Sequence, residues 1–408
     1  MTSVLHYGVD SEVRLELPPG VLVAECGGNA AGKLDDVAAT LDSALHAPLE
    51  FPPLAQAAVP GDTVVIAIDQ GVPQAAALMP PVVRTLVELG VPPRNIAILL
   101  PQNGRRAPRE DPRCMLADRL RGEVGFLTHD ARNRDQLAYL AATRDGRPIY
   151  LNRAMLDADL VLPIGCTRCA STPGYLGVLG GIYPTFADAA AQGRVGAATA
   201  GELDIPARRQ AWREVEEVGW LLGVQFAVQV VPGRAGTVGH VVAGQIDAVA
   251  RRSTQLCDAA WSYHVPRRAS LVIAAIEGQR AEQTWDNVGR ALAAASRAVE
   301  DDGSIAICCD LDEAPGPGVA QCAGADDLRV VYRRIVHDAP ADTLPAAQLA
   351  LALARTRVYL LSRLDESTVE ELGMAPVSSA AEIARLAGRH PSCILLANAQ
   401  HTVATLDS

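Results

Sequence analysis

The strongest constraint on the fold is a regular alternation of short apolar segments with longer amphipathic ones. Residues 62–69 (DTVVIAID) and 95–101 (NIAILLP) are apolar runs of strand length. Between them, residues 80–90 (PPVVRTLVELG) have helical spacing and end at a glycine. Strand, helix and strand at these lengths form a βαβ unit, whose strands pair in parallel. The alternation continues along the chain, which predicts an α/β fold with mainly parallel sheets.

The chain is too long for one hydrophobic core, because 408 residues correspond to two or three domains. A strand is expected at 223–231 and a helix over about 240–259, and the alternation restarts with residues 269–278 (ASLVIAAIEG). We therefore expect two α/β domains, residues 1–268 and 269–408, with a cleft between them. The extreme C-terminus is allowed to pack back on the first domain.

Charge and hydropathy exclude two classes of partner. The net charge is −11, whereas a nucleic-acid surface needs clustered lysine and arginine. No apolar run reaches the roughly 18 residues of a membrane helix, and the first twenty residues lack the pattern of a secretory signal. We expect a cytoplasmic protein with no nucleic-acid or membrane partner, for which a homodimer is compatible with the chain length.

The ends of the predicted strands carry the first candidate binding residues, since ligands of open α/β sheets bind at the carboxyl ends of strands. Asp69 ends one strand, and Arg105 and Arg106 follow the next; segment 277–287, which contains Trp285, follows another. Two guanidinium groups suit a carboxylate or phosphate, and a solvated basic turn explains them equally well. Asp69 suits either a hydroxyl acceptor or a turn cap.

A glycine-rich segment is the second candidate. Residues 174–186 (GYLGVLGGIYPTF) carry four glycines within eight residues, among them Gly177, Gly180 and Gly181. Such density marks a backbone that bends sharply or lies against a ligand. Just before it, Cys166 and Cys169 have a spacing found in zinc sites, but no second cysteine or histidine pair accompanies them. We expect two small residues in a turn and no metal site.

Segments in a fixed order along most of the chain resemble the nickel-dependent lactate racemase family. They include residues 47–69, 86–106, 173–181, 358–383 and 393–403. The resemblance implies a larger N-terminal and a smaller C-terminal α/β domain with the active site between them. It also implies a nickel-pincer nucleotide, which a lysine of the glycine-rich loop tethers and a histidine ligates. In that family a hydride leaves C2 of a 2-hydroxy acid and returns to the opposite face.

This sequence departs from the family at the residues that carry that chemistry. Tyr183 stands where the resemblance places the tethering lysine, and tyrosine cannot form the thioamide. Thr199 or a neighbour stands at the nickel histidine, and Arg105 and Pro173 stand at or near the two proton-carrying histidines. We therefore expect the nickel-pincer cofactor to be absent and the racemase chemistry to be lost.

Three functions stay open after this comparison. The first is binding of a small anionic 2-hydroxy acid or nucleotide-like ligand in the cleft. The second is an enzyme with a rebuilt active site, with Tyr183, Asp69 or His129 as acid or base. The third is an inactive scaffold or partner of an active paralogue. The residues expected to contact a ligand are Asp69, Arg105, Arg106, Gly177, Gly180, Gly181, Tyr183 and Trp285.

Overall fold

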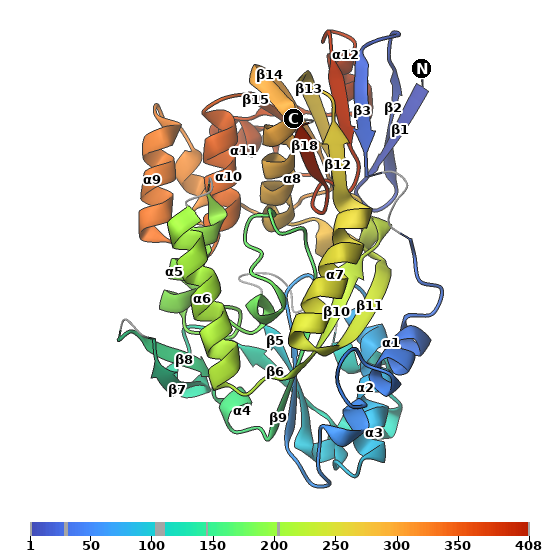
Figure 1. Ribbon diagram of the computed structural model, residues 1–408. Helices are drawn as coiled ribbons and strands as arrows, with labels where there is room; N and C mark the ends of the chain where they lie inside the picture. Colours follow the sequence, from blue (N-terminus) through green and yellow to red (C-terminus); the bar gives the residue numbers. More distant parts are fainter. Residues whose placement is uncertain (1, 28–31, 103–110, 144–145, 202–204, 407–408) are drawn as a thin grey trace.

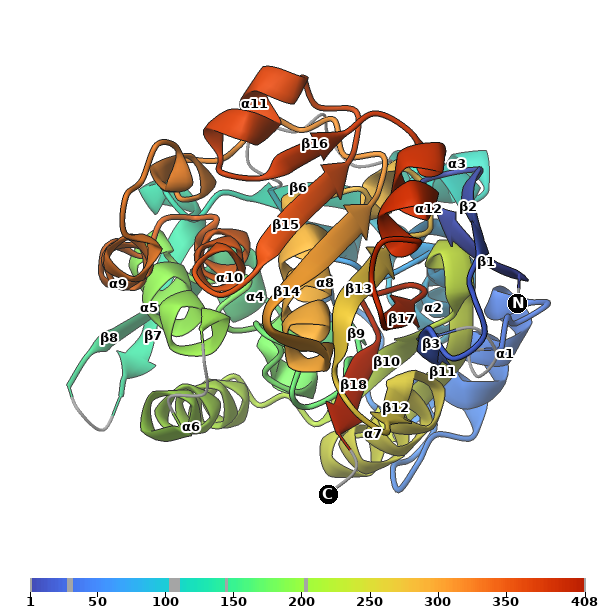
Figure 2. The same ribbon diagram turned by 90° about the horizontal axis from the view of Figure 1, so that it is seen from above.

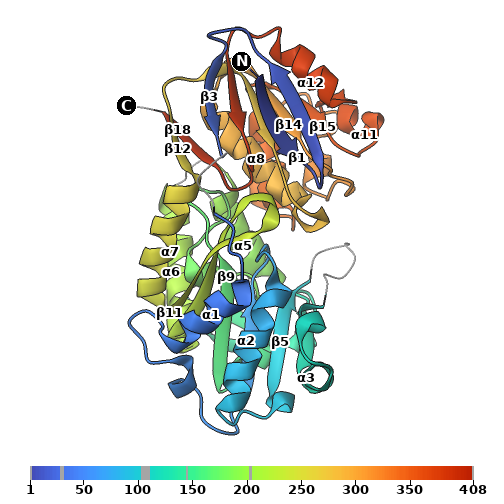
Figure 3. The ribbon, with the colours of Figure 1, turned by 90° about the vertical axis from the view of Figure 1, so that its right-hand side faces the viewer.

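The computed structural model describes residues 2–27, 32–102, 111–143, 146–201 and 205–406. The chain forms two α/β units, each built on a six-stranded sheet, and the units lie one above the other (Figures 1 and 3). We call residues 37–261 the first unit, and residues 2–26 with 269–396 the second unit; a separate two-stranded sheet is formed by residues 262–265 and 403–406. The predicted α/β fold with mainly parallel sheets is confirmed.

The sheet of the first unit has the strand order β11-β10-β9-β4-β5-β6, and only its β10–β11 pair is antiparallel. Along β4, Val64, Ile66 and Ile68 pack in one core cluster, while Val65 and Ala67 pack in another on the opposite face. A strand covered on both faces has to be apolar throughout, which explains its uninterrupted sequence. The strands are β4 (Val64–Ile68), β5 (Ile96–Pro101), β6 (Gly125–His129), β9 (Leu160–Cys166), β10 (Phe226–Pro232) and β11 (Val238–Gln245).

Helices and one hairpin surround this sheet. The helices are α1 (Val37–His46), α2 (Ala75–Glu88), α3 (Asp118–Glu123), α4 (Arg153–Leu156), α5 (Ala189–Ala200), α6 (Ile205–Leu221) and α7 (Ile246–Trp261). The hairpin consists of β7 (Leu137–Ala142) and β8 (Pro148–Asn152). The helix predicted over about 240–259 is wrong at its start, because residues up to Gln245 form β11 and pair with β10. Within the described ranges, no helix has both the length and the apolarity to cross a membrane.

The sheet of the second unit has the order β16-β15-β14-β13-β17-β3, and all its pairs are parallel (Figure 2). The face of β13 that carries Val272 and Ala274 packs with residues of α8 and α10, and the opposite face packs with residues of β1, β2 and α12. The strands are β13 (Ala269–Ala275), β14 (Val299–Cys308), β15 (Arg357–Leu361), β16 (Ala375–Val377) and β17 (Cys393–Leu396). The helices are α8 (Trp285–Ala298), α9 (Leu328–Asp338), α10 (Thr343–Leu353), α11 (Glu366–Glu371) and α12 (Ala380–Ala387).

The N-terminal segment belongs to the second unit. The hairpin of β1 (Thr2–Tyr7) and β2 (Ser11–Glu16) contributes to that unit's core, and β3 (Leu22–Cys26) pairs with β17 at the sheet edge. The predicted N-terminal domain of residues 1–268 therefore starts too early, since the first strands add to the sheet of the predicted 269–408 domain. A short edge strand carries no signal in its own sequence for the sheet that it joins.

The C-terminal segment lies against the first unit. Strand β18 (Val403–Leu406) pairs in parallel with β12 (Ser262–Val265), which directly follows α7. Val403 packs in one cluster with Val231, Cys169 and Trp261. The chain thus crosses between the units at both ends, and Val403 near the C-terminus packs against residues of the first unit.

Candidate functional site

The glycine-rich loop lies against protein groups. It contains a short 3-10 helix, Val178–Gly181. Gly177 has a φ of 74°, and a Cβ there would lie 2.7 Å from the ring of Trp212. A Cβ on Gly181 would lie 3.1 Å from the Cβ of Asp69. Close packing against α6 and the end of β4 is therefore sufficient to explain why glycine stands at these two positions.

Asp69 lies at the carboxyl edge of the first sheet, where the sequence places it. Its Oδ1 accepts a hydrogen bond from the backbone N–H of Gln70 at 2.6 Å and one from the hydroxyl of Thr185 at 3.3 Å. The same hydroxyl lies 3.0 Å from the carbonyl oxygen of Gly180. Asp69, Gly180 and Gly181 thus lie close together. Through Thr185, the carboxylate of Asp69 binds the glycine-rich loop to the end of β4. A ligand contact of Asp69 stays a prediction.

Tyr183 lies in the core of the first unit. Its ring is fully buried, its hydroxyl donates to the carboxylate of Glu214, and Arg194 donates to the same hydroxyl at 2.9 Å. Burial and the hydrogen bond to Glu214 raise the pKa of Tyr183 far above its ordinary value. A buried phenol whose hydroxyl is already occupied is a poor acid or base, so the structure does not support Tyr183 as a catalytic or ligand-binding residue.

His129 and Trp285 also have internal partners. Nε2 of His129 donates to the carbonyl of Ala187 at 2.9 Å, and Nδ1 accepts from the amide of Asn152 at 3.1 Å. Burial lowers the pKa of His129, so the ring is held neutral. Trp285 is 5% exposed and donates from Nε1 to the carbonyl of Glu313 at 2.9 Å. These contacts favour structural roles. Arg105 and Arg106 lie outside the described residues.

The cysteines of the 166–169 turn do not act as a pair. Cys169 Sγ lies 3.9 Å from Sγ of Cys257 on α7, and burial raises the pKa of the Cys166 thiol to about 11. Among the residues that the structure describes, no three His, Cys, Asp or Glu side chains gather as a metal site would require. Both thiols pack as small buried side chains.

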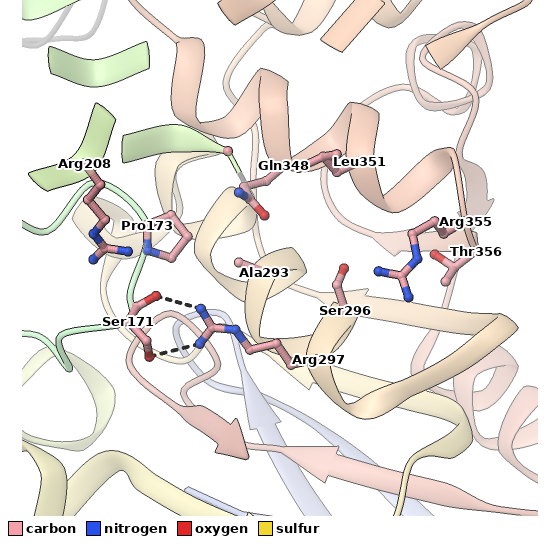
Figure 4. Close-up of a pocket in the computed structure, with 11 residues that line it drawn as sticks. Ser171, Pro173, Arg208, Ala293, Ser296, Arg297, Gln348, Leu351, Arg355 and Thr356 are labelled. Atoms are coloured by element: carbon pink, nitrogen blue, oxygen red, sulfur yellow. Dashed lines mark hydrogen bonds between the residues drawn. The ribbon is translucent and has the colours of Figure 1, made fainter. Parts of the chain in front are cut away.

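A cavity of about 180 Å³ lies between the two units (Figure 4). The loop after β9 contributes Ser171 and Pro173, and α6 contributes Arg208. From the second unit, α8 supplies Arg297 and the segment that follows α10 supplies Arg355. The remaining lining residues are Gly201, Ala293, Ser296, Gln348, Leu351 and Thr356. Among the described residues, the lining is therefore cationic and contains no carboxylate.

Helix α8 positions two arginines on this boundary. Arg290, Ala293 and Arg297 are spaced three and four residues apart, so they share one helix face. The small side chain of Ala293 leaves space between them. Nη1 of Arg297 donates to Oγ of Ser171 at 3.1 Å, and Nη2 donates to its carbonyl at 2.7 Å. Arg208 donates to the carbonyl of Ala170. These bonds fix both guanidinium groups on the loop after β9.

The arginines of this boundary lie close to one another, and burial and mutual repulsion lower the pKa values of two of them. Burial and then the positive charge of Arg208 lower the pKa of Arg297. Deeper in the boundary, burial and then the charge of Arg168 lower the pKa of Arg290 to about 10. Arg168 is 7% exposed and donates to Nδ1 of His401 at 3.2 Å. Burial, followed by Arg168 and Arg290, holds the pKa of His401 well below its ordinary range, so the ring accepts that bond as a neutral imidazole.

Four of these arginines have no carboxylate partner within ion-pair distance in the described part of the chain: Arg168, Arg208, Arg290 and Arg297. A buried charge without a partner costs several kcal/mol. Three buried polar atoms of this region form no hydrogen bond with the described residues. They are Oγ1 of Thr172, Oε1 of Gln400 and Nε of Arg290. They belong to residues that line a second hollow of about 10 Å³, which shares Pro173, Ala293 and Arg297 with the main cavity. Among the described residues, the boundary thus gathers arginine side chains that have no carboxylate partner.

Comparison with known proteins shows which family and which solved structures this chain is similar to. Residues 7–192 match the family described as the lactate racemase N-terminal domain. The chain is thus similar to the lactate racemase family in sequence over these residues and, by the structures that follow, in fold. The lactate racemase apoprotein from Thermoanaerobacterium thermosaccharolyticum superposes with a TM-score of 0.79 at 18% identity, over 99% of this chain and 100% of that one. A protein from Thermotoga maritima has a TM-score of 0.68 at 14% identity, over 92% and 100%. No curated protein matches the sequence.

The cavity lies beside two of the positions at which the resemblance places the family's histidines. Pro173 lines it, and so does Gly201, two residues after Thr199. Thr199 itself is buried, and its hydroxyl donates to the carbonyl of Val195 at 3.0 Å. Tyr183, which stands at the tethering position, is engaged with Glu214 in the core. These residues do not fit the tethered nickel-pincer nucleotide, and no reaction step through that group follows from them.

Proposed function

We propose that this lactate racemase-like protein binds a small anionic 2-hydroxy acid in the cavity between its units, and that it does so without the family's tethered nickel chemistry. One observation carries the proposal: Arg208 and Arg297 reach the cavity without a carboxylate partner among the described residues. An anion that neutralises them removes the cost of burying unpaired charge. Guanidinium groups suit a carboxylate because their N–H donors match its two oxygens.

The size of the cavity supports a small acid over a nucleotide. Its volume of about 180 Å³ lies below the roughly 300–1,000 Å³ of pockets that hold drug-sized ligands. The lining also contains groups that suit a hydroxyl, namely the side chains of Ser296, Gln348 and Thr356. A hydroxy acid of a few carbon atoms uses both kinds of group.

The chemistry of the lining supports binding over catalysis. None of the eleven described residues that line the cavity is a histidine, cysteine, tyrosine, lysine or carboxylate. Arginine does not release its proton near neutral pH, so it serves neither as general base nor as general acid. The described lining can therefore hold an anion but has no group to move a proton to or from its C2 carbon.

Calorimetric titration with L-lactate, D-lactate and glycolate tests the proposal. Arg208→Gln removes one guanidinium group from the cavity, and Arg209→Gln removes the exposed arginine beside it on α6 as a matched control. A charge-assisted hydrogen bond is worth about 1.5–3 kcal/mol, so Arg208→Gln should weaken binding by roughly tenfold to a hundredfold. The control should bind like the wild type.

Two results would contradict the proposal. Equal affinities of the Arg208→Gln and wild-type proteins would remove the cavity from the binding site. Absence of binding by the wild type at millimolar ligand would favour a scaffold. Chiral analysis of L-lactate after incubation with the protein covers the remaining alternative, because formation of D-lactate would show a rebuilt active site.

A further inference from the structure

Both ends of the cavity are cationic (Figure 4). Arg208 and Arg297 lie at one end, beside Ser171 and Pro173. Arg355 lies at the other end with Thr356, and its guanidinium group is directed toward Ser296 on α8. A ligand with a single carboxylate satisfies only one of these ends.

The middle of the cavity is uncharged. Ala293, Gln348 and Leu351 lie between the two ends. The cavity volume of about 180 Å³ limits the ligand to a few carbon atoms. The lining thus offers an uncharged centre between two cationic ends.

The charge count leads to the same ligand. Arg208, Arg297 and Arg355 bring three positive charges to the lining. Nη2 of Arg355 donates to Asp301 at 2.6 Å, and the Asp301 side chain is 74% exposed, so it lies outside the cavity and compensates one charge. Within the described lining, two positive charges remain. Guanidinium has five N–H donors, and the hydrogen bond to Asp301 uses one, which leaves donors for a ligand.

We infer that the ligand is a hydroxydicarboxylic acid of four or five carbons, with one carboxylate between Arg208 and Arg297 and the other at Arg355. The inference rests on the proposed function, because it assigns the ligand class of the same cavity. Arg355 is then the residue that determines specificity for a diacid. Ser296 and Thr356 are the hydroxyl groups beside the second carboxylate.

Titration calorimetry with L-malate, D-malate, L-2-hydroxyglutarate and L-lactate tests the inference. The wild type should bind at least one of the three diacids tenfold or more tightly than L-lactate. Arg355→Gln should reduce that preference at least tenfold and change L-lactate affinity less than twofold. Arg357→Gln is the matched control, because it removes an exposed positive charge two residues away that does not line the cavity. It should retain the preference.

Arg355→Lys keeps the charge and should retain more of the diacid preference than Arg355→Gln, which separates recognition from a folding defect. A wild type that binds L-lactate as tightly as every diacid overturns the inference, as does an Arg355→Gln protein with an undiminished preference. L-lactate binding that depends on Arg208 would still uphold the proposed function in either case. Tighter binding of 3-phosphoglycerate than of every diacid would assign the Arg355 end to phosphate and also overturn the inference. No binding of any acid contradicts both proposals.

Discussion

Tyr183→Phe separates a structural tyrosine from a catalytic one. Phenylalanine keeps the ring that fills the core of the first unit and deletes only the hydroxyl. That hydroxyl donates to Glu214, whose side chain is 8% exposed, and accepts from Nη2 of Arg194 at 2.9 Å. Nη2 of Arg194 also donates to Glu214 directly, so the arginine keeps a partner in the variant.

The loss is therefore dominated by the single bond to a buried carboxylate. A hydrogen bond to a charged group contributes about 1.5–3 kcal/mol, and we expect the free energy of unfolding to fall by about that amount. Urea unfolding followed by circular dichroism measures it. Tyr139→Phe is the control: Tyr139 is 57% exposed on β7, and surface substitutions usually change stability by less than about 0.5 kcal/mol.

The same variant should bind L-lactate and L-malate like the wild type, because Tyr183 does not line the cavity. The reasoning would be refuted by the opposite pattern, in which Tyr183→Phe unfolds at the wild-type urea concentration but no longer binds acids. That outcome would show that Tyr183 contacts the ligand, as the sequence predicts.

Two further predictions concern pH and thiol chemistry. Burial lowers the pKa of His401 and His129 below the ordinary 6.5, so below about pH 6.5 the unfolded chain takes up protons that the native state does not, and stability falls with falling pH. Each histidine changes the free energy of unfolding by at most about 1.4 kcal/mol per pH unit. Between roughly pH 7.5 and 5.5, the urea midpoint of His401→Gln should therefore fall less steeply than that of the wild type. Equal slopes for the two proteins would contradict this. Cys114 is the exposed thiol among nine cysteines, so Ellman's reagent should titrate one thiol rapidly in the native protein and nine after denaturation. Rapid reaction of two or more would show that the buried thiols are accessible.

The strands could be predicted where they are buried on both faces. Continuous apolar runs at residues 62–69 and 95–101 became β4 and β5 with shifts of two residues at most. The start of the first domain could not be predicted, because Leu22–Cys26 is a short edge strand whose partner, β17, lies at the other end of the sequence. Residues 240–245 belong to β11 and not to the predicted helix. Their hydrophobic pattern does not show a clear strand period, and their antiparallel pairing with β10 is visible only in the structure.

The site was harder to predict than the fold. Asp69 and Gly181 do meet at the carboxyl edge of the first sheet, as strand order implies. Tyr183 is a candidate only through its position in a loop that resembles the family's, and a sequence position does not reveal that Glu214 and Arg194 bind its hydroxyl in the core. Arg290 and Arg297 do carry a readable signal, since they stand two helical turns apart in an alanine-rich helix. Their role depends on which face of α8 meets the other unit, and that information is tertiary.

A crystal structure of the protein soaked with L-malate tests the central claim most directly. The account predicts electron density for the acid between the units, with one carboxylate in contact with Arg208 and Arg297 and the other in contact with Arg355. The same acid beside Asp69 and the glycine-rich loop, with the arginine-lined cavity filled by solvent, would contradict it.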